Sequence, residues 1–314
     1  AEDGSIAWEI PVDTNSWIQT APTVLDLDGN NQLDFVVGTW DFNNFDSVVA
    51  FRRDNQQRMW SFALNDHLYH GTAVADFDND GNPELLFGSY NDTIYCLNGE
   101  DGTLDWKYWG QGGYCGAPIS LGDVDNDGSC DVVFASGSRI TALTGTGSFM
   151  WNYTIPAPGG AFRGTALADI NNDQFLDVII GSDGGKLIAL HGNSGAHMWT
   201  VDLRAHYGNS QFELSHAPLV ADFDGDDTLD VFIAGGHAEY PAFTNGFGRA
   251  YMVSTGSLGN GPDWMMFQRD IRRQASLCSP FLTSDEENAA PLAQEISVFP
   301  NPASSRLNID GIAN

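Results

Sequence analysis

Positive charge is scarce in this sequence of 314 residues. Only 13 Lys and Arg residues face 42 Asp and Glu residues, so the formal net charge at pH 7 is −29. Nothing resembles a basic stripe, and nucleic acid is therefore not expected as a partner. No apolar run approaches the roughly 18 residues of a membrane-spanning helix, so no membrane span is expected.

Cysteine is scarce as well. The four cysteines form no CxxC pair and have no metal-binding spacing. They are compatible with one disulfide in an oxidising compartment, but the sequence does not decide which residues would pair. The seven histidines form no catalytic triad and no closed metal set, so the sequence identifies no catalytic residue.

The acidic residues recur in five short clusters between apolar, aromatic and glycine-rich stretches. The clusters begin 50, 47, 46 and 53 residues apart and occupy residues 26–34, 76–84, 123–131, 169–177 and 222–230. Self-similarity at such a period is typical of repeat architectures.

Each period reads as four short strands. A strand of small residues precedes the acidic cluster, two apolar strands follow it, and a segment with one tryptophan ends the period, at Trp60, Trp106, Trp151, Trp199 and Trp264. Four strands joined by tight turns are typical of one propeller blade. A solenoid is the alternative, but its coils hold fewer strands. The sequence therefore predicts an all-β fold, a β-propeller of four-stranded antiparallel blades with five blade repeats.

The repeats also resemble a known family. Phe87-Gly88 after a second strand and Gly116-Ala117-Pro118 before a first strand resemble the FG-GAP (VCBS-type) repeat of integrin-alpha-like propellers. The tryptophan-bearing fourth strand is similar to that of pyrroloquinoline-quinone-type propellers. The resemblance covers residues 1–272 and implies calcium sites in the loops and a place at the cell surface.

The two ends of the propeller region bear on how its ring closes. The segment ending at Trp8 repeats the one ending at Trp106, so we expect the chain to begin in the fourth strand of a blade. That strand either completes the last blade or belongs to a blade outside this sequence. Six tryptophan-type outer strands stand against five inner strands, which favours a fragment of a larger ring.

Beyond the propeller the sequence changes character. Residues 273–291 are polar and aperiodic and are predicted to be a linker. In residues 292–314, Pro300-Asn301-Pro302 and Leu307-Asn308-Ile309 resemble the start of the C-terminal sorting domain of type IX secretion. The alternative is an ordinary Pro-Asn loop before a last strand. The resemblance implies a secreted or cell-surface protein whose C-terminus is recognised by secretion machinery.

The acidic clusters follow the pattern D-x-[DN]-x-[DN]-x-x-x-[DE]. This pattern puts side-chain oxygens at positions 1, 3, 5 and 9 of one short turn, and Ca²⁺ prefers such oxygen ligands. The alternative is an acidic hairpin without metal, in which the carboxylates would repel one another. We therefore predict up to five Ca²⁺ ions. Position 6 is expected to have positive φ, which favours Gly, Asn or Asp. The fourth loop has Gln174 there and Asn171 in place of an acid at position 3, so we expect its site to be the weakest. The predicted ligands are Asp26, Asp28, Asn30, Asp34, Asp76, Asp78, Asp80, Glu84, Asp123, Asp125, Asp127, Asp131, Asp169, Asn171, Asp173, Asp177, Asp222, Asp224, Asp226 and Asp230.

A second group of residues is expected at the other end of the blades. Residues that precede the inner strand or follow the second strand lie opposite the acidic loops in this architecture, and aromatic rings beside polar groups suit a ligand such as a sugar. The alternative is that these side chains only cap strand ends. The candidate ligand-binding residues are Trp40, His70, Tyr90, Arg163, His216, His237 and Tyr240.

These observations favour a non-catalytic module that binds an extracellular glycan or a cell-surface or matrix protein, in the manner of an adhesion domain. The alternative is a calcium-dependent propeller polysaccharide lyase. A lyase needs a base and a charge-neutralising group beside the uronate. Arg163 and the histidines offer such groups without a motif that assigns the roles.

Overall fold

The computed structural model describes residues 4–12, 16–40, 46–239 and 245–258, with Trp264, Arg269 and residues 275–278, 297–299 and 308–310. The chain forms two units, Ala1–Phe281 and Leu282–Asn314. Strands dominate the described residues, and their one helix is the five-residue α1 (Leu203–Tyr207). No helix among them is long and apolar enough to cross a membrane.

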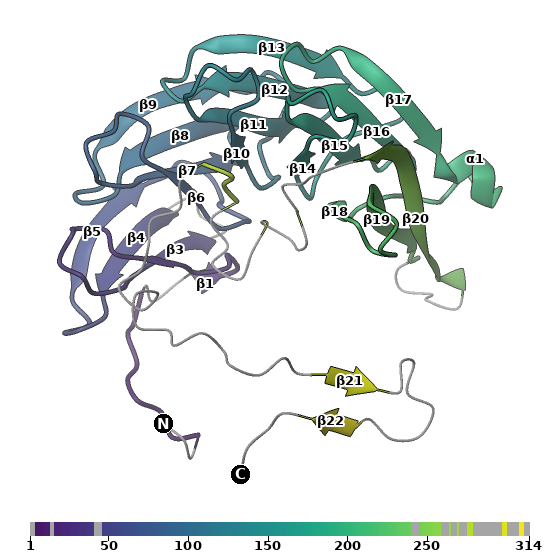
Figure 1. Cartoon of the computed structure of the whole chain (residues 1–314). Helices are drawn as coiled ribbons and strands as arrows, with labels where there is room; N and C mark the ends of the chain where they lie inside the picture. Colours follow the sequence, from purple (N-terminus) through teal and green to yellow (C-terminus); the bar gives the residue numbers. More distant parts are fainter. Residues whose placement is uncertain are drawn as a thin grey trace. The chain divides into compact units, whose positions relative to one another are not determined.

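The first unit contains five antiparallel sheets that follow one another along the chain and around an arc (Figure 1). In the first sheet, β1 and β2 both pair with one edge of β3, which β4 and β5 extend on the other side. Its strands are β1 (Trp17–Ile18), β2 (Thr23–Leu25), β3 (Asp34–Trp40), β4 (Ser47–Arg52) and β5 (Arg58–Ala63).

The next three sheets share one plan, in which four strands pair in chain order. Their strands are β6 (Ala73–Ala75), β7 (Glu84–Ser89), β8 (Thr93–Asn98) and β9 (Leu104–Trp109); β10 (Ser120–Gly122), β11 (Asp131–Ser136), β12 (Arg139–Thr144) and β13 (Phe149–Thr154); and β14 (Thr165–Ala168), β15 (Asp177–Gly181), β16 (Lys186–His191) and β17 (His197–Asp202). The fifth sheet has three strands, β18 (Leu219–Ala221), β19 (Thr228–His237) and β20 (Phe247–Leu258). The predicted all-β propeller of four-stranded antiparallel blades is confirmed.

The first strand of each blade lies on the inner side of the arc. Strand β10 contacts both β6 and β14, and β14 contacts β18. These inner strands are short and built largely of small residues, as in Ala73–Ala75, and every residue of β6, β10 and β14 is buried. Small side chains let neighbouring backbones approach closely, which explains why each period opens with Ala, Gly, Ser or Thr.

The tryptophans of the fourth strands join each blade to the next. The indole Nε1 of Trp60 donates to the carbonyl of Gly99 at 2.7 Å, and Trp106 donates to Gly145 at 2.9 Å. Trp151 makes the same bond to Gly192 at 2.6 Å. Each of these three indoles reaches the turn between the third and fourth strands of the following blade, so one tryptophan links each of the first three blades to the next.

The structure corrects two expectations about outer strands. Trp264 pairs with Val220 of the inner strand β18 through backbone bonds of 2.8 and 2.9 Å, so it does not form a fourth strand on the outer edge. Residues 4–10 form no strand, and Trp8 is 45% exposed beside Phe35. Both segments carry the local Trp pattern, but pairing depends on contacts that the pattern does not contain.

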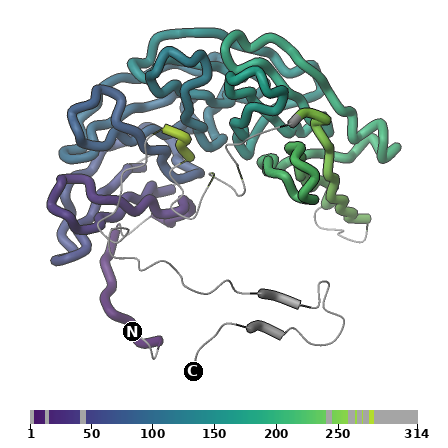
Figure 2. The backbone as a smooth tube through the Cα atoms, viewed as in Figure 1, coloured from purple at the N-terminus to yellow at the C-terminus, as the bar shows by residue number. Residues whose placement is uncertain are grey.

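Part of the predicted linker 273–291 packs against the third blade. Leu121 of β10 donates to the carbonyl of Ala275 and accepts from the backbone of Leu277, both at 2.8 Å. Cys278 forms a disulfide with Cys130, whereas Cys96 and Cys115 are free and buried. Figure 2 shows residues 275–278 in yellow-green on the inner side of the arc. The first unit accordingly extends to Phe281, beyond the expected boundary at residue 272.

The second unit contains one described element, the antiparallel pair of β21 (Ser297–Phe299) and β22 (Asn308–Asp310). Asn308 and Ile309 of the predicted sorting motif lie in β22. Pro300, Asn301, Pro302 and Leu307 lie outside the described residues.

The contact between tryptophan and glycine gives a prediction for stability. Gly147 has φ +78°, and an added Cβ would lie 2.8 Å from Cδ2 of Trp106. Gly256 has a similar φ of +70° with no atom within 4 Å of such a Cβ. We expect Gly147→Ala to lower the free energy of unfolding by about 1–3 kcal/mol more than Gly256→Ala, because only the first overpacks an interface between blades. Equal losses in urea titrations would contradict this role of the tryptophan.

Candidate functional site

The five acidic loops share one internal hydrogen-bond frame. The carboxylate at position 1 accepts the backbone N–H groups of positions 5 and 6; Asp76, for example, accepts from Asp80 at 3.2 Å and from Gly81 at 3.0 Å. The side chain at position 5 accepts the N–H of position 7, as Asp80 does from Asn82 at 2.7 Å. The corresponding bonds recur in the other four loops.

The carboxylate at position 9 is buried in all five loops, and in the first four blades it is the first residue of the second strand. Glu84 accepts the backbone N–H of Phe77 at 2.7 Å, and Asp131 accepts that of Val124 at 3.0 Å. The loops of Asp34 and Asp177 repeat this bond. Asp230 is 3% exposed, and its Oδ2 is buried without a hydrogen-bond partner in the described structure.

Two backbone positions in each loop have positive φ. Positive φ was expected at position 6, and even Gln174 adopts φ +74° there. The sequence analysis missed position 4, although its signal was present, since only glycine and asparagine stand there. The residues at position 4 are Gly29, Asn79, Asn126, Asn172 and Gly225, with φ between 60° and 79°. These are the residue types that best tolerate the left-handed region.

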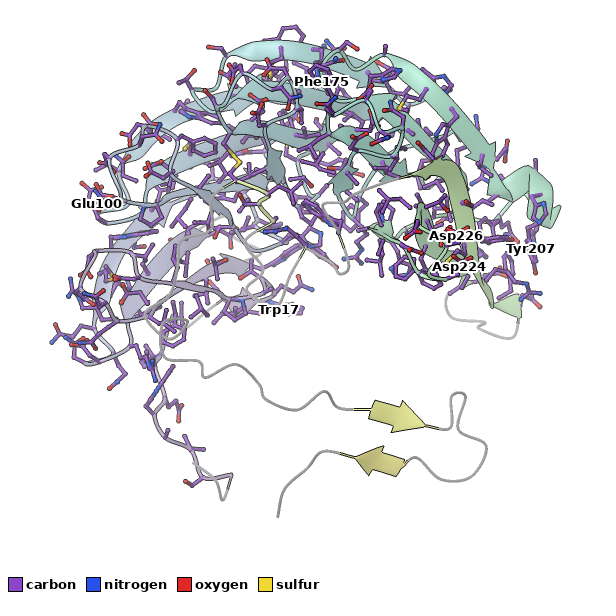
Figure 3. All side chains as sticks on the ribbon, viewed as in Figure 1. Trp17, Glu100, Phe175, Tyr207, Asp224 and Asp226 are labelled. Carbon is purple, nitrogen blue, oxygen red and sulfur yellow. A yellow bond between two sulfur atoms is a disulfide. The ribbon has the colours of Figure 1, made fainter. Side chains whose placement is uncertain are left out.

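The loops bring possible metal ligands close together. In four loops, three carboxylates each offer an oxygen within 4.8 Å of the others, namely Asp26, Asp28 and Asp34; Asp76, Asp78 and Glu84; Asp123, Asp125 and Asp127; and Asp222, Asp224 and Asp230. Figure 3 labels Asp224 and Asp226 in the fifth loop, where they lie close together. In the fourth loop the group is Asp173, Asp177 and His191, and Asp169 is not among them.

One residue of the third strand pairs with position 9 in every blade, and in the first four blades it is the last residue of that strand. Asp34 pairs in register with Arg52, and Asp177 pairs with His191. The equivalent residues in the other blades are Asn98, Thr144 and Ser254. The guanidinium of Arg52 lies 2.6 Å from Asp28, so the first loop has an internal cation. The sequence analysis missed both Arg52 and His191, because the motif ends before the strand that supplies them.

Burial raises the pKa of the carboxyl groups at position 9. It is the largest cause for Glu84 and Asp131, whose pKa values rise to about 7, and the other carboxylates of each loop raise them further. The same causes raise the pKa of Asp34 to about 6 and that of Asp177 to about 8. A bound cation would favour the charged forms, so these loops suit either a proton or a metal ion.

At the opposite end of the blades, half-buried aromatic rings form one continuous surface, the aromatic face (Trp40, His67, Tyr69, Tyr90, Tyr114 and Phe162). Trp40 stacks on His67 with ring centroids 4.2 Å apart and meets Tyr69 and Tyr90 edge-on at 5.6 and 5.5 Å. Tyr90 stacks on Tyr114. Phe162 lies 5.3 Å from Tyr69. These residues precede an inner strand or follow a second strand, opposite the acidic loops.

Arg163 and His70 supply polar groups beside this face. The Arg163 guanidinium lies over Tyr69 at 5.5 Å and over Phe162 at 5.0 Å. Its Nε is buried and has no hydrogen-bond partner among the described residues. His70 is 8% exposed. Burial is the largest cause that lowers its pKa, and the charge of the nearby Arg163 lowers it further, to about 3, so this imidazole is neutral.

The remaining candidates lie along the fourth and fifth blades. His216 lines one shallow pocket with Arg163 and Leu219 and a second with Glu213 and His237. Tyr240 lies outside the described residues. Four predicted residues, Trp40, His70, Tyr90 and Arg163, therefore meet at or beside the aromatic face. The sequence analysis missed Tyr69 and Phe162, although each directly precedes a residue it named.

One acid–base pair lies at the same end. His67 Nδ1 is 2.8 Å from Oδ2 of Asp46, whose side chain is fully buried. A buried carboxylate fixes the orientation of the imidazole that stacks on Trp40.

The family model described as outer membrane protein assembly factor BamB (PQQ_2) matches residues 44–255. Cartilage acidic protein 1 of Xenopus tropicalis is 26% identical over 183 residues, 51% of this chain and 26% of that protein. Integrin alpha-7 of Homo sapiens is 21% identical over 248 residues, 60% and 21% of the two chains. Lambda-carrageenase of Pseudoalteromonas carrageenovora is 27% identical over 94 residues, which make up 30% of this chain and 9% of that protein.

The chain thus spans about a quarter or less of the length of these curated relatives. Among solved structures, the quinohemoprotein alcohol dehydrogenase ADHIIG from Pseudomonas putida HK5 has a TM-score of 0.52 at 14% identity. The likeness covers 91% of this chain and 48% of that one, and it concerns the fold alone.

The raised pKa values predict how pH affects the metal-free protein. The folded protein holds protons on Glu84 and Asp131 up to about pH 7, whereas the unfolded chain releases them near pH 4. This contribution to stability is therefore complete below about pH 4 and is lost as the pH rises through 7. In EDTA, we expect the melting temperature to fall between pH 5 and pH 8.

Two variants test the cause. Glu84→Gln keeps the shape of the side chain without its titration and should reduce the fall. Glu100→Gln, in the exposed turn labelled in Figure 3, should leave it unchanged. A melting temperature that rises from pH 5 to pH 8 in EDTA would contradict the assignment.

Proposed function

The chain belongs to the PQQ_2 family, described as outer membrane protein assembly factor BamB, and we propose that it is a calcium-stabilised, extracellular, non-catalytic module that binds an acidic glycan. The observation that carries the proposal is Arg163, a cation without a described ion pair, lying on half-buried aromatic rings in a chain of net charge −29. Aromatic rings stack on sugars, and an arginine beside them would pair with a carboxylate or sulfate.

The calcium part of the proposal is supported by the oxygen-only ligand sets. The second, third and fifth loops each group three carboxylates, and the residue paired with position 9 there is Asn98, Thr144 or Ser254. None of these neighbours is a cation, so a calcium ion would meet no internal competitor there. In the first loop, calcium would have to displace Arg52 from Asp28. The FG-GAP resemblance and the integrin alpha-7 match are consistent with this assignment.

The extracellular part is supported by the disulfide between Cys130 and Cys278, since disulfides persist mainly in oxidising compartments. The resemblance of residues 292–314 to a type IX sorting domain points the same way. In this proposal the secretion machinery recognises the C-terminus, and the propeller acts outside the cell or on its surface.

The family name also raises the question of a quinone cofactor. Pyrroloquinoline quinone carries several carboxylates and would need several cations around it. Of the described residues beside the aromatic face, Arg163 supplies a permanent positive charge and His70 is neutral. The residues therefore do not fit this cofactor.

A polysaccharide-cleaving enzyme is the second candidate. It is favoured by the match to lambda-carrageenase and by the His67–Asp46 pair, which lies on the same face as Arg163. His67 would serve as the base, and Arg163 would neutralise the carboxylate of the substrate. New ultraviolet absorbance or reducing ends on incubation with acidic polysaccharide would favour this candidate over simple binding.

Calcium should stabilise the folded chain. With dissociation constants of roughly 10⁻⁴–10⁻³ M, each site adds about 0.4–1.4 kcal/mol at millimolar calcium. We expect Asp78→Asn and Asp125→Asn each to remove one calcium ion in equilibrium dialysis and to reduce the shift in urea unfolding. Asp105→Asn, on an exposed strand outside the loops, serves as the control. Identical unfolding curves in calcium and in EDTA would refute the calcium assignment.

Binding should depend on Arg163 and on the rings beneath it. On an array of acidic and neutral polysaccharides, we expect Arg163→Met to weaken binding to acidic members about 10- to 100-fold, the effect of losing a hydrogen bond to a charged group. Tyr69→Ala should weaken binding to all members. Arg53→Met removes an exposed arginine in the turn after β4 and should change neither. Unchanged binding by Arg163→Met, or binding only to proteins, would overturn the glycan assignment.

A further inference from the structure

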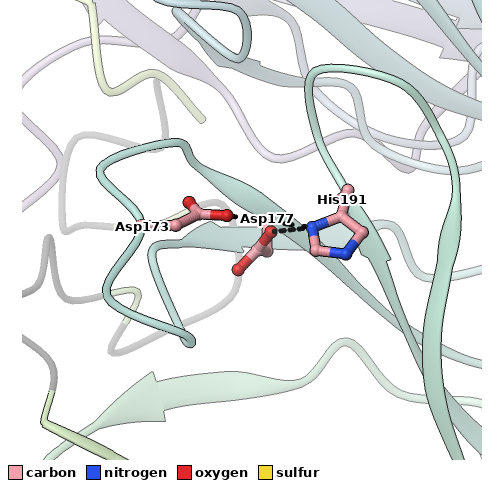
Figure 4. A group of neighbouring side chains, drawn as sticks. All are labelled: Asp173, Asp177 and His191. Carbon is pink, nitrogen blue, oxygen red and sulfur yellow. Dashed lines mark ion pairs between the residues drawn. The ribbon is translucent and has the colours of Figure 1, made fainter.

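The fourth acidic loop differs from the others in the ligands it brings together. Asp173 and Asp177 meet an imidazole rather than a third carboxylate (Figure 4). His191 Nδ1 lies 3.7 Å from Oδ1 of Asp177 and 3.9 Å from Oδ2 of Asp173. All three ligand atoms lie within 4.8 Å of one another.

The sheet register places this imidazole. His191 ends β16 directly opposite Asp177, just as Arg52, Asn98, Thr144 and Ser254 stand opposite position 9 in the other blades. Histidine occurs at this position in the fourth blade alone. The approach of His191 to the carboxylates therefore follows from strand pairing and does not depend on a flexible surface side chain.

Burial gives a second, independent observation. The Asp177 side chain is fully buried; its Oδ2 accepts the backbone N–H of Ile170 at 3.3 Å, and its Oδ1 has no hydrogen-bond partner among the described residues. A buried carboxylate oxygen without a partner is costly. This oxygen is the one that faces His191 and Asp173, so the missing partner belongs between them.

The two contacts are within ion-pair distance, but a hydrogen-bonded ion pair does not account for this arrangement. A charge-assisted hydrogen bond between an imidazolium and a carboxylate would be about 2.7–2.9 Å long. Both distances from His191 exceed this by almost 1 Å. Two donor atoms bound to one ion of tetrahedral zinc, at about 2.0–2.1 Å each, would lie about 3.3 Å apart. The observed spacings of 3.7 and 3.9 Å therefore need only small shifts to close around such an ion.

The donor set also disfavours calcium relative to the other loops. Position 3 is Asn171, where the others have aspartate, and its amide donates to Oδ2 of Asp173 at 3.0 Å. The Asp169 carboxylate, held by two backbone N–H groups, lies outside the group. Calcium takes six to eight oxygen ligands, whereas imidazole suits zinc and its neighbours among the transition metals.

We infer that the fourth loop is a site for a divalent transition-metal ion, held by Asp173, Asp177 and Nδ1 of His191. The side chains of Asp173 and His191 are 40% and 39% exposed, so water can complete the coordination. The inference shares with the proposed function the premise that the acidic turns hold metal ions, but it assigns this turn a different metal and does not require calcium in the others.

The test uses the whole chain, stripped of metal, with Co²⁺ as a spectroscopic probe and Zn²⁺ as a competitor. Wild type should bind one Co²⁺ tightly, with visible absorption bands that zinc abolishes. His191→Asn copies the residue of the second blade. Loss of a residue that only hydrogen-bonds to a metal ligand typically weakens metal binding roughly 10- to 100-fold, so loss of a ligand should weaken Co²⁺ and Zn²⁺ binding by at least this much. His197→Asn removes an exposed histidine from the same blade and should leave this binding unchanged.

The outcomes separate this inference from the proposed function. If His191→Asn binds Co²⁺ as tightly as wild type, or if wild type shows no tight Co²⁺ site, the inference is wrong. Calcium dialysis on the same proteins reports on the other loops. Calcium binding without a His191-dependent cobalt site would leave the calcium proposal intact and overturn only the inference; the reverse result would support the inference and overturn the calcium proposal.

Discussion

A buried carboxylate at position 9 of each acidic loop, at or near the start of the second strand, is the constraint on which this structure depends. In the first four loops this carboxylate accepts the backbone N–H of position 2, and the other acids of the loop surround it. Burial favours the neutral form of such a group, and the negative charge of the surrounding carboxylates attracts a cation. Each loop therefore favours a positive charge beside this carboxylate, which a proton, an arginine or a metal ion could supply.

The same short strands connect the acidic loops to the aromatic face. Tyr69 and His70 lie shortly before β6, and the loop of Asp76 begins directly after it. Strand β7 begins with Glu84 and ends just before Tyr90. A metal ion bound in this loop, as proposed, would hold β6 against β7 at one end and would thereby also restrain the rings at the other. Restraint of this kind reduces the entropy lost when a ligand binds, so metal binding and recognition need not be separate properties of the blade.

The sequence was most informative where structure is local and repeated. Period, loop frame and strand order all follow from short patterns, and the sheet pairings of Glu84 and Asp131 match them. The misses involve contacts between distant segments. Trp264 has the tryptophan of an outer strand but pairs with Val220, and residues 275–278 pair with Leu121 although they read as linker. Tyr69 and Phe162 are in contact although they precede the inner strands of the second and fourth blades, which are about two repeat periods apart in the sequence.

Variation among the repeats is as informative as the repeat itself. Acids occupy positions 1 and 9 of all five loops, and in the first four loops both of them accept backbone N–H groups of the turn. The residue opposite position 9 is not part of this turn and differs from blade to blade. It is Arg52, Asn98, Thr144, His191 or Ser254. Arg52 and His191 approach the carboxylates of their loops, whereas Asn98 and Thr144 bond to residues of the turn that follows the third strand. If the loops hold metal ions as proposed, this one position would change the cation that a loop prefers without changing the fold.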